Sequence, residues 1–112
     1  EPVCGCDGIT YWNATLAARA EVGTAQAGVC PGVGGNTQFC FLNKNCPNGT
    51  DCAKESVIGA CYATDSGKCW KLPNQCPQNA TSTTHGCDGK CFGYCEAIRR
   101  DKGFYNGATC AP

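Results

Sequence analysis

The chain opens with EPVCGCDGITYWNATLAARAEVG, residues 1–23, in which a single glycine separates Cys4 from Cys6. Residues 6–30 and 87–110 align with each other from a shared Cys-Asp-Gly start to a closing cysteine. Both copies pass through an aromatic residue and then a segment that contains alanine and arginine. The sequence therefore holds one short cysteine-bounded pattern twice, and this repeat predicts the fold.

Cysteine dominates the composition, with 13 in 112 residues. Thiols at this density persist in an oxidising compartment or bound to metal, which favours a secreted or cell-surface protein. Only 15 residues are Val, Ile, Leu or Phe, so burial alone is a weak source of stability. Each bridge that closes a loop of about 15 residues contributes roughly 3 kcal/mol, and disulfides are expected to hold the chain together. Because Glu1 is not methionine, we expect either a removed signal peptide or a piece excised from a longer protein.

Each copy predicts a short helix after its aromatic residue. In the first copy Asn13 is a suitable N-cap for a helix over Ala14–Glu21, with Gly23 as the stop. In the second copy a helix over Cys95–Lys102 would end at Gly103. Two turns of helix are too short to be stable alone in water, so these helices need covalent support.

Short strands complete the predicted architecture. Asp-Gly turns lead into aromatic-bearing strands, and closing strands are expected around Val22–Ala27 and Phe104–Tyr105. The fold class is a small disulfide-rich α+β protein of two modules, each with short hairpins and one two-turn helix. The expected boundaries follow the cysteines and the glycines: a truncated half-module at 1–30, a Gly-rich linker at 31–39, and a second unit at 40–112 made of a cysteine-rich hairpin region (40–75) and a core (76–112).

Charge and composition exclude several functions. Nine basic residues balance nine acidic ones, which argues against nucleic-acid binding by field strength alone. No stretch has the roughly 20 apolar residues of a membrane span. An enzyme is disfavoured because His85 is the only histidine and no serine elbow or carboxylate pair stands out. Asp7 and Asp88 are expected to hydrogen-bond their own turns, and no cofactor is expected.

Three glycosylation patterns point to surface loops. They are Asn13-Ala-Thr15, Asn48-Gly-Thr50 and Asn79-Ala-Thr81. In a secreted chain each asparagine is a candidate for a glycan.

The stretch PVCGCDGITYWNA at 2–14, with GVC ending at Cys30, resembles the Kazal and follistatin-type domains. The remainder resembles the longer version found in secreted bacterial proteins, where a cysteine-rich hairpin region precedes the Kazal core. Its half-cystine positions are matched by Cys46-Pro-Asn-Gly-Thr-Asp-Cys52, Gly59-Ala-Cys61, Lys68-Cys69 and Cys76.

This resemblance implies a set of disulfides. Cys4 would pair with Cys30, and Cys76 with Cys95. Cys110 lacks its usual partner in the second copy, and Cys91 is the candidate to replace it. Thirteen cysteines are an odd number, so at least one is unpaired or bonded to another molecule, and we expect that one to be Cys6. Pairing within 40–69 stays open.

The resemblance also implies two functions. The preferred one is a non-enzymatic extracellular structural or protein-binding module, with head-to-tail assembly of copies into a fibre or surface layer as an extension. The alternative is a serine protease inhibitor with its reactive bond between Gln78 and Asn79, after Pro77. The spacing of Cys87, Cys91 and Cys95 resembles a zinc cluster, but the glycosylation patterns and the family resemblance favour disulfides, so no metal is expected.

The ten aromatic residues are expected to fill the core, with one exception. Trp12 follows Tyr11 on a short strand, and neighbouring strand residues point to opposite faces. We therefore expect Trp12 to face outward as a contact residue. The aromatic residues are Tyr11, Trp12, Phe39, Phe41, Tyr62, Trp70, Phe92, Tyr94, Phe104 and Tyr105.

Overall fold

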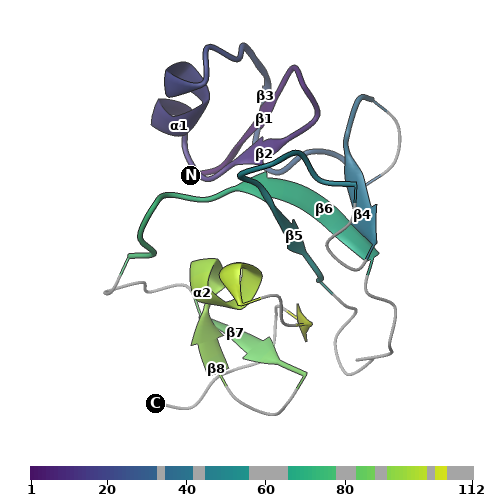
Figure 1. Cartoon of the computed structure of the whole chain (residues 1–112), viewed down its shortest axis with the longest axis vertical. Coiled ribbons are helices and arrows are strands. Elements are labelled where there is room, and N and C mark those ends of the chain that lie inside the picture. Colours follow the sequence, from purple (N-terminus) through teal and green to yellow (C-terminus); the bar gives the residue numbers. More distant parts are fainter. Residues whose placement is uncertain are drawn as a thin grey trace.

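Two small β-sheets, each accompanied by one short helix, make up the described part of the chain (Figure 1). The structure is a computed structural model measuring 38 × 29 × 22 Å along its principal axes. The first sheet and helix α1 lie at one end of the long axis, and α2 with the second sheet lies at the other. The described residues are 1–32, 35–41, 45–55, 66–77, 83–87, 91–100 and 103–105.

The first sheet combines the first repeat with the hairpin region. Its strands are β1 (Val3–Gly5), β2 (Thr10–Tyr11), β3 (Thr24–Ala27), β4 (Phe39–Phe41), β5 (Asp51–Ala53) and β6 (Ser66–Lys71). Strand β1 lies between β2 and β3 and is antiparallel to both. Strand β2 then joins β6 in parallel, through the pair Thr10 and Trp70. The first repeat is therefore hydrogen-bonded into the same sheet as the hairpin region.

Strand β6 is the centre of this sheet. Lys68 pairs with Phe39 of β4 and also with Ala53 of β5, so β4 and β5 lie on opposite edges of β6. Trp70 pairs with β5 and with β2, which places β2 beyond β4 along the same edge. The Lys68 ammonium also donates to the carbonyl of Cys30 at 2.9 Å and ties β6 to the end of the first repeat.

The second sheet has the same strand order as the first repeat. Its strands are β7 (Thr83–Gly86), β8 (Cys91–Gly93) and β9 (Phe104–Tyr105), ordered β8-β7-β9. In each repeat the first strand lies between the second and the third, and the helix follows the second strand. A backbone hydrogen bond of 3.1 Å from Phe104 to the carbonyl of Lys54 joins β9 to the residue after β5.

Both helices are shorter than the sequence predicts. Helix α1 spans Ala14–Arg19, where Asn13 accepts a hydrogen bond from the Leu16 backbone as the predicted N-cap. It ends before Glu21 because that residue has a positive φ of 58°, so the chain leaves the helix two residues ahead of Gly23.

Helix α2 begins one residue earlier than predicted. It spans Tyr94–Arg99, follows Gly93, and has no side-chain cap. Lys102, the predicted end of this helix, lies outside the described residues. The closing strand of the first repeat starts at Thr24 and not at Val22, whereas β9 has the predicted bounds.

The core consists of two clusters in which cysteines replace many of the usual aliphatic side chains. One cluster lies between β5, β6 and α2 and includes Ala53, Trp70, Leu72, Cys95, Ala97, Ile98 and Phe104. The other lies under the first repeat and includes Ile9, Tyr11, Ala17, Cys40, Cys52 and Cys69.

Disulfides link these clusters to the surrounding loops. The bonds within the described residues are Cys4–Cys30, Cys40–Cys52, Cys46–Cys69 and Cys76–Cys95. The protein is therefore a small disulfide-rich chain with a mixed sheet and two short helices, and several disulfides are typical of extracellular proteins. Neither α1 nor α2 has the length and apolar character needed to cross a membrane.

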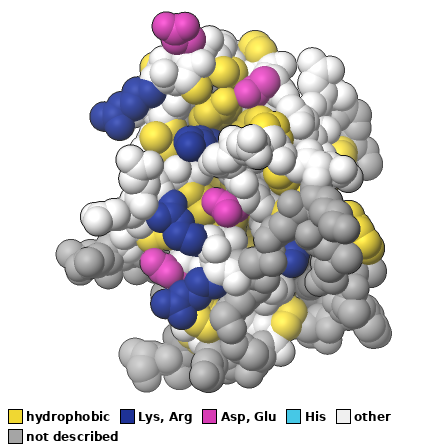
Figure 2. All heavy atoms as spheres, viewed as in Figure 1, with side chains coloured by type: hydrophobic (Ala, Val, Ile, Leu, Met, Phe, Trp, Pro, Cys, Tyr) yellow, Lys and Arg dark blue, Asp and Glu magenta, His cyan; other side chains and the backbone are white. Residues whose placement is uncertain are grey.

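Charged side chains of both signs are scattered over the face shown in Figure 2, with hydrophobic side chains between them. No broad area of a single charge appears among the described residues on that face. This distribution agrees with the equal numbers of acidic and basic residues.

Candidate functional site

The cysteines named in the sequence analysis occupy defined positions. Cys4 and Cys30 form a disulfide with their Cα atoms 4.7 Å apart, and Cys76 bonds to Cys95 at the start of α2. These are the two pairs that the family resemblance implies. Cys91 is disulfide-bonded, but its expected partner Cys110 lies outside the described residues.

Cys6 is free and exposed, and the second repeat has a matching cysteine in a different state. The Cys6 backbone N–H donates to the carbonyl of Gly23 at 2.7 Å, and that of Cys87 donates to Gly103 at 2.9 Å. Each glycine leaves room for the sulfur, because an added Cβ would lie 3.4 Å from the Cys6 sulfur and 3.2 Å from the Cys87 sulfur. Cys87 is disulfide-bonded, so equivalent positions differ in bonding.

The turn that carries Cys6 is built around Asp7. One carboxylate oxygen of Asp7 accepts from the Ile9 backbone at 3.1 Å, and the other accepts from the Tyr11 hydroxyl at 2.7 Å. The Asp7 carbonyl accepts from the side chain of Gln38 at 2.8 Å. Burial, with the Asp7 hydrogen bond and charge, raises the pKa of Tyr11 to about 12. The Cys6 thiol is thus presented on a turn fixed from several sides.

Two of the three glycosylation candidates are described. Asn13 uses its side-chain oxygen to cap α1, accepting from the Leu16 backbone at 2.9 Å. Asn48 is exposed in a turn, and the hydroxyl of Thr50 donates to the carbonyl of Pro47 at 2.6 Å in the same turn. Asn79 lies outside the described residues. Asn13 thus lies at the start of α1, and Asn48 lies in the turn that precedes β5.

The proposed inhibitory loop is only partly described. Pro77 is exposed, while Gln78 and Asn79 lie outside the described residues. The segment just before Pro77 is held against α2, because Arg99 donates to the carbonyls of Pro73 and Asn74, the latter at 2.6 Å. The Cys76–Cys95 bond fixes the same segment.

Three other sulfurs lie close together under β6. The sulfurs of Cys40, Cys46 and Cys69 are within 4.8 Å of one another. Each is already in a disulfide, so the group consists of two neighbouring bridges. The cysteines whose spacing resembles a zinc cluster are disulfide-bonded as well; they are Cys87, Cys91 and Cys95.

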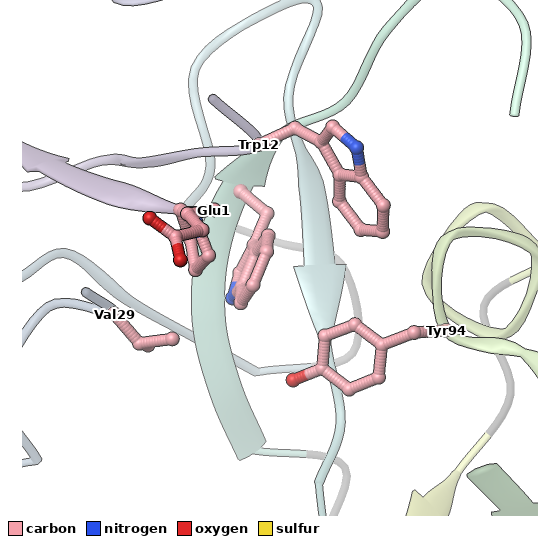
Figure 3. A pocket seen from close by; sticks show the side chains of 6 residues that line it. Glu1, Trp12, Val29 and Tyr94 are labelled. Carbon is pink, nitrogen blue, oxygen red and sulfur yellow. The ribbon is translucent and has the colours of Figure 1, made fainter. Parts of the chain in front are cut away.

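A hollow of about 400 Å³ lies where the first repeat, β6 and α2 meet. In Figure 3, Glu1 and Val29 lie on one side of the opening, and Trp12 and Tyr94 lie on the other. We call this feature the aromatic hollow; it is lined by Glu1, Pro2, Trp12, Val29, Trp70 and Tyr94.

Three aromatic rings form much of the wall of the aromatic hollow. The centroids of Trp12 and Trp70 are 6.1 Å apart, those of Trp12 and Tyr94 are 6.2 Å apart, and those of Trp70 and Tyr94 are 5.4 Å apart. The rings are tilted to one another by 32° to 68°, so they do not form one flat platform. The Tyr94 hydroxyl donates to the carboxylate of Glu55 at 3.3 Å, and its ring packs edge-on against the buried Phe104.

Of the residues that line this hollow, the sequence pointed to Trp12 alone as a contact residue. Tyr11 is buried as expected, but Trp12 does not face fully outward: it follows β2, is half-buried and packs against the core cluster that contains Trp70. The assignment of Phe39 and Phe41 to the core is wrong, since they are 48% and 52% exposed on β4 while Cys40 between them points inward. Tyr62 lies outside the described residues. Trp70 reaches Trp12 through the β2–β6 pairing, and Tyr94 reaches it through the packing of α2 on the core cluster; no local sequence pattern signals either contact.

The Kazal resemblance has no independent support from other proteins. No family model, no curated protein and no solved structure matches this chain. The assignment to that family therefore stays a prediction from the motifs.

Proposed function

We propose that the chain is an extracellular, non-enzymatic protein-binding module that bonds through Cys6 to a second copy of itself. The observation that carries this proposal is the different state of two equivalent cysteines. Cys6 is free and exposed, whereas Cys87, held by the same backbone hydrogen bond to a glycine, is in a disulfide. Because the first repeat keeps the cysteine without its bond, the Cys6 thiol is available to bond to another molecule.

The setting of Cys6 supports an attachment role. Its neighbours Gly5, Asp7 and Gly8 are held in hydrogen bonds within the turn or to Gln38. A thiol on a rigid exposed turn loses little conformational entropy when a partner approaches. Exposure also allows the in-line approach that thiol–disulfide exchange needs.

The bond forms by exchange with a small disulfide of the extracellular medium. A Cys6 thiolate attacks the small disulfide and releases one thiolate, leaving a mixed disulfide. The Cys6 thiolate of the second copy then displaces the other small thiol and forms the Cys6–Cys6 bond. Two protein thiols are oxidised and one small disulfide is reduced to two thiols.

One Cys6 in each copy makes pairs by this chemistry and nothing longer. Head-to-tail extension into a fibre or surface layer needs a further noncovalent contact. The exposed Phe39 and Phe41 on β4, and the wholly exposed strand β3, are surfaces suited to such a contact.

The test is the covalent state of secreted protein whose thiols are alkylated at harvest. We expect a dimer on non-reducing electrophoresis, an intact mass of twice the chain, and a Cys6–Cys6 peptide after digestion. Cys6→Ser should be monomeric with unchanged circular dichroism. A wild-type monomer with alkylated Cys6 would contradict the proposal, as would a dimer that persists in Cys6→Ser under non-reducing conditions.

The inhibitor alternative has one observation in its favour, which is the bracing of the segment before Pro77. Arg99 and the Cys76–Cys95 bond fix that segment on α2, and a rigid loop is what an inhibitor presents. Trypsin requires a basic residue at the specificity position. Under this alternative Gln78→Lys should inhibit trypsin with one-to-one stoichiometry while wild type does not. If trypsin instead cleaves the variant as an ordinary substrate, the alternative is wrong.

A further inference from the structure

The aromatic hollow contains the two features that recognise an organic cation. It has three aromatic rings on its wall and a carboxylate, Glu1, at its opening. None of its six lining residues is Lys, Arg or His, so the only cation among them is the N-terminal ammonium of Glu1, which lies on the same residue as the carboxylate. Aromatic faces carry negative partial charge and attract cations within about 6 Å of the ring centroid. The wall therefore favours a positive ligand over a neutral or negative one.

The spacing of the rings allows one cation to lie near all three. Their centroids are 5.4 to 6.2 Å apart. Trp12 and Tyr94 are half-buried and offer ring surface to a ligand, whereas Trp70 is 3% exposed and forms the floor beneath them. A cation held against Trp12 and Tyr94 above this floor is within about 6 Å of the ring centroids. The protein already makes one such contact elsewhere, where the Arg100 guanidinium lies 5.9 Å from the centroid of the Phe92 ring.

The charge near Tyr94 and the rigidity of two of the rings also favour the binding of a cation in the hollow. The Tyr94 hydroxyl donates to the Glu55 carboxylate at 3.3 Å, which draws electron density toward the ring. Trp70 is only 3% exposed and sits in the core cluster, while Tyr94 is fixed edge-on against Phe104 at 5.2 Å. Two of the three rings are therefore held in place before a ligand arrives, so binding orders few side chains.

We propose that the aromatic hollow binds a small soluble quaternary ammonium compound, with its trimethylammonium group against Trp12 and Tyr94 over the floor formed by Trp70, and its charge balanced by the Glu1 carboxylate. The volume of about 400 Å³ lies in the range of about 300–1,000 Å³ typical of small-molecule sites. A trimethylammonium group suits this wall because it has charge without hydrogen-bond donors, and the lining offers few acceptors. This binding does not depend on Cys6, which is not among the lining residues.

Other occupants fit the hollow less well. A sugar needs a flat aromatic platform with hydrogen-bond partners at its rim, whereas these rings are tilted by up to 68°. A neutral apolar ligand would gain nothing from the carboxylate. The neutral ligand is distinguished from an organic cation by the neutral isostere used in the test.

The experiment titrates the protein with choline and with its neutral isostere 3,3-dimethylbutanol. The chain has only two tryptophans, Trp12 and Trp70, and both line the hollow, so tryptophan fluorescence reports on this site alone; calorimetry gives the affinity. We expect choline to bind and the neutral isostere to bind at least about tenfold more weakly, since about 1.4 kcal/mol of cation–π energy is a factor of ten. Equal binding of both, or no binding of choline at millimolar concentrations, would overturn the proposal.

Variants separate ring chemistry from simple loss of packing. Trp12→Leu keeps an apolar side chain but removes the π face, and should weaken choline binding about tenfold, while Trp12→Phe should weaken it less. Glu1→Ser removes the carboxylate but keeps the N-terminal ammonium, and should weaken binding by a smaller factor that disappears at high salt. Phe39→Leu is the matched control, because it removes an exposed aromatic ring outside the hollow and should leave binding unchanged. Unaltered binding in Trp12→Leu, with fold confirmed by circular dichroism, would contradict the proposal.

A separate arm identifies the source of the cation. Phosphatidylcholine vesicles present the same trimethylammonium group on a lipid surface. We expect free choline to saturate the site and vesicles not to sediment the protein. Cosedimentation that free choline abolishes would show that the hollow takes a lipid headgroup, and would contradict a soluble ligand.

Discussion

The two repeats have the same order of elements but are stabilised in different ways. Strands β1, β2 and β3 with α1 in the first repeat match β7, β8 and β9 with α2 in the second. Helix α1 buries one residue, Ala17, and is capped by Asn13. Helix α2 has no side-chain cap but buries Cys95, Ala97 and Ile98. Helix α1 is therefore stabilised mainly by its N-cap, and helix α2 by the burial of one face.

This difference shows how a repeat can keep its topology while its supports change. The position of Ala17 corresponds to Ala97, and both are fully buried against their sheets. The next residue is exposed Ala18 in α1 but buried Ile98 in α2. In both repeats one alanine of the helix faces the sheet. The remaining stability comes from the Asn13 cap in the first repeat and from burial of Ile98 in the second.

The largest expected effect comes from removing the bond that closes the first repeat. The double variant Cys4→Ala/Cys30→Ala opens a loop with a sequence separation of 26, which should lower the free energy of unfolding by about 3.5 kcal/mol. Strand β3 is wholly exposed and, among the strands that the structure describes, pairs only with β1, so it should lose its amide protection. Hydrogen exchange and urea unfolding, in a Cys6→Ser background to prevent thiol exchange, measure both effects.

The matched variant in the second repeat is Cys76→Ala/Cys95→Ala. Its sequence separation is 19, so the loss of stability should be only slightly smaller. The local effect should differ, because burial of Ile98 and the hydrogen bonds of Arg99 still hold α2 on the core. Equal loss of amide protection in β3 and α2 would show that the two repeats do not differ in this way.

The next largest effect tests the buried face of α2. Ile98→Ala makes this position like Ala18 of the first repeat, and should reduce stability by about 3 kcal/mol because it leaves a cavity beside Trp70 and Phe104. Leu16→Ala, at a half-buried position of α1, is the control and should reduce stability clearly less. Chemical denaturation gives both values. If the two substitutions had equal effects, the helices would not differ in their dependence on burial.

The sequence was sufficient for the features set by local chemistry. The repeat of Cys-Asp-Gly, the Asn13 cap and the burial of Tyr11 all follow from rules that act over a few residues. The helix ends were less accurate, because Glu21 leaves the helix in a left-handed conformation that sequence patterns assign to glycine.

The candidate site was not predictable from the sequence in the same way. It depends on β2 lying parallel to β6, about 60 residues later in the chain, which brings Trp12 to Trp70. Long-range parallel pairing has no local signal, since its partners are chosen by packing and by disulfides. The exposure of Phe39 and Phe41 has the same origin, because Cys40 must point inward to reach Cys52 and its neighbours on the strand then point out.

A smaller effect tests the turn that presents Cys6. Tyr11→Phe converts the site to the phenylalanine found at the matching position, Phe92, and removes a hydrogen bond to the Asp7 carboxylate, at a cost of about 2 kcal/mol. The raised pKa of Tyr11, about 12 against the ordinary 10.0, means that the folded state holds this proton more tightly than the unfolded state. The associated stability is fully present below pH 10 and is lost as the pH rises towards 12.

Ultraviolet titration of tyrosinate and unfolding at several pH values check this prediction. Wild type should show one tyrosine that ionises near pH 12, and Tyr11→Phe should lack it and lose less stability between pH 10 and 12. Both proteins need the Cys6→Ser background, since thiolates exchange with disulfides at high pH. An unchanged late titration in Tyr11→Phe would show that the shifted group is another tyrosine.

The smallest effect concerns the helix cap that only the first repeat has. Asn13→Ala removes the acceptor for the Leu16 backbone and should lower stability by about 1 kcal/mol. Asn13→Gly copies Gly93 of the second repeat and should cost only a few tenths of that amount, because glycine is tolerated at this position. Asn13→Asp keeps the acceptor but removes the glycosylation site, so it separates the effect of the cap from that of a glycan, and Thr15→Ala removes the site while leaving Asn13 in place. Urea unfolding of the four variants should therefore give the lowest stability for Asn13→Ala and a stability near wild type for Asn13→Asp. If Asn13→Asp were as destabilised as Asn13→Ala, α1 would be stabilised by a glycan on Asn13 and not by the cap.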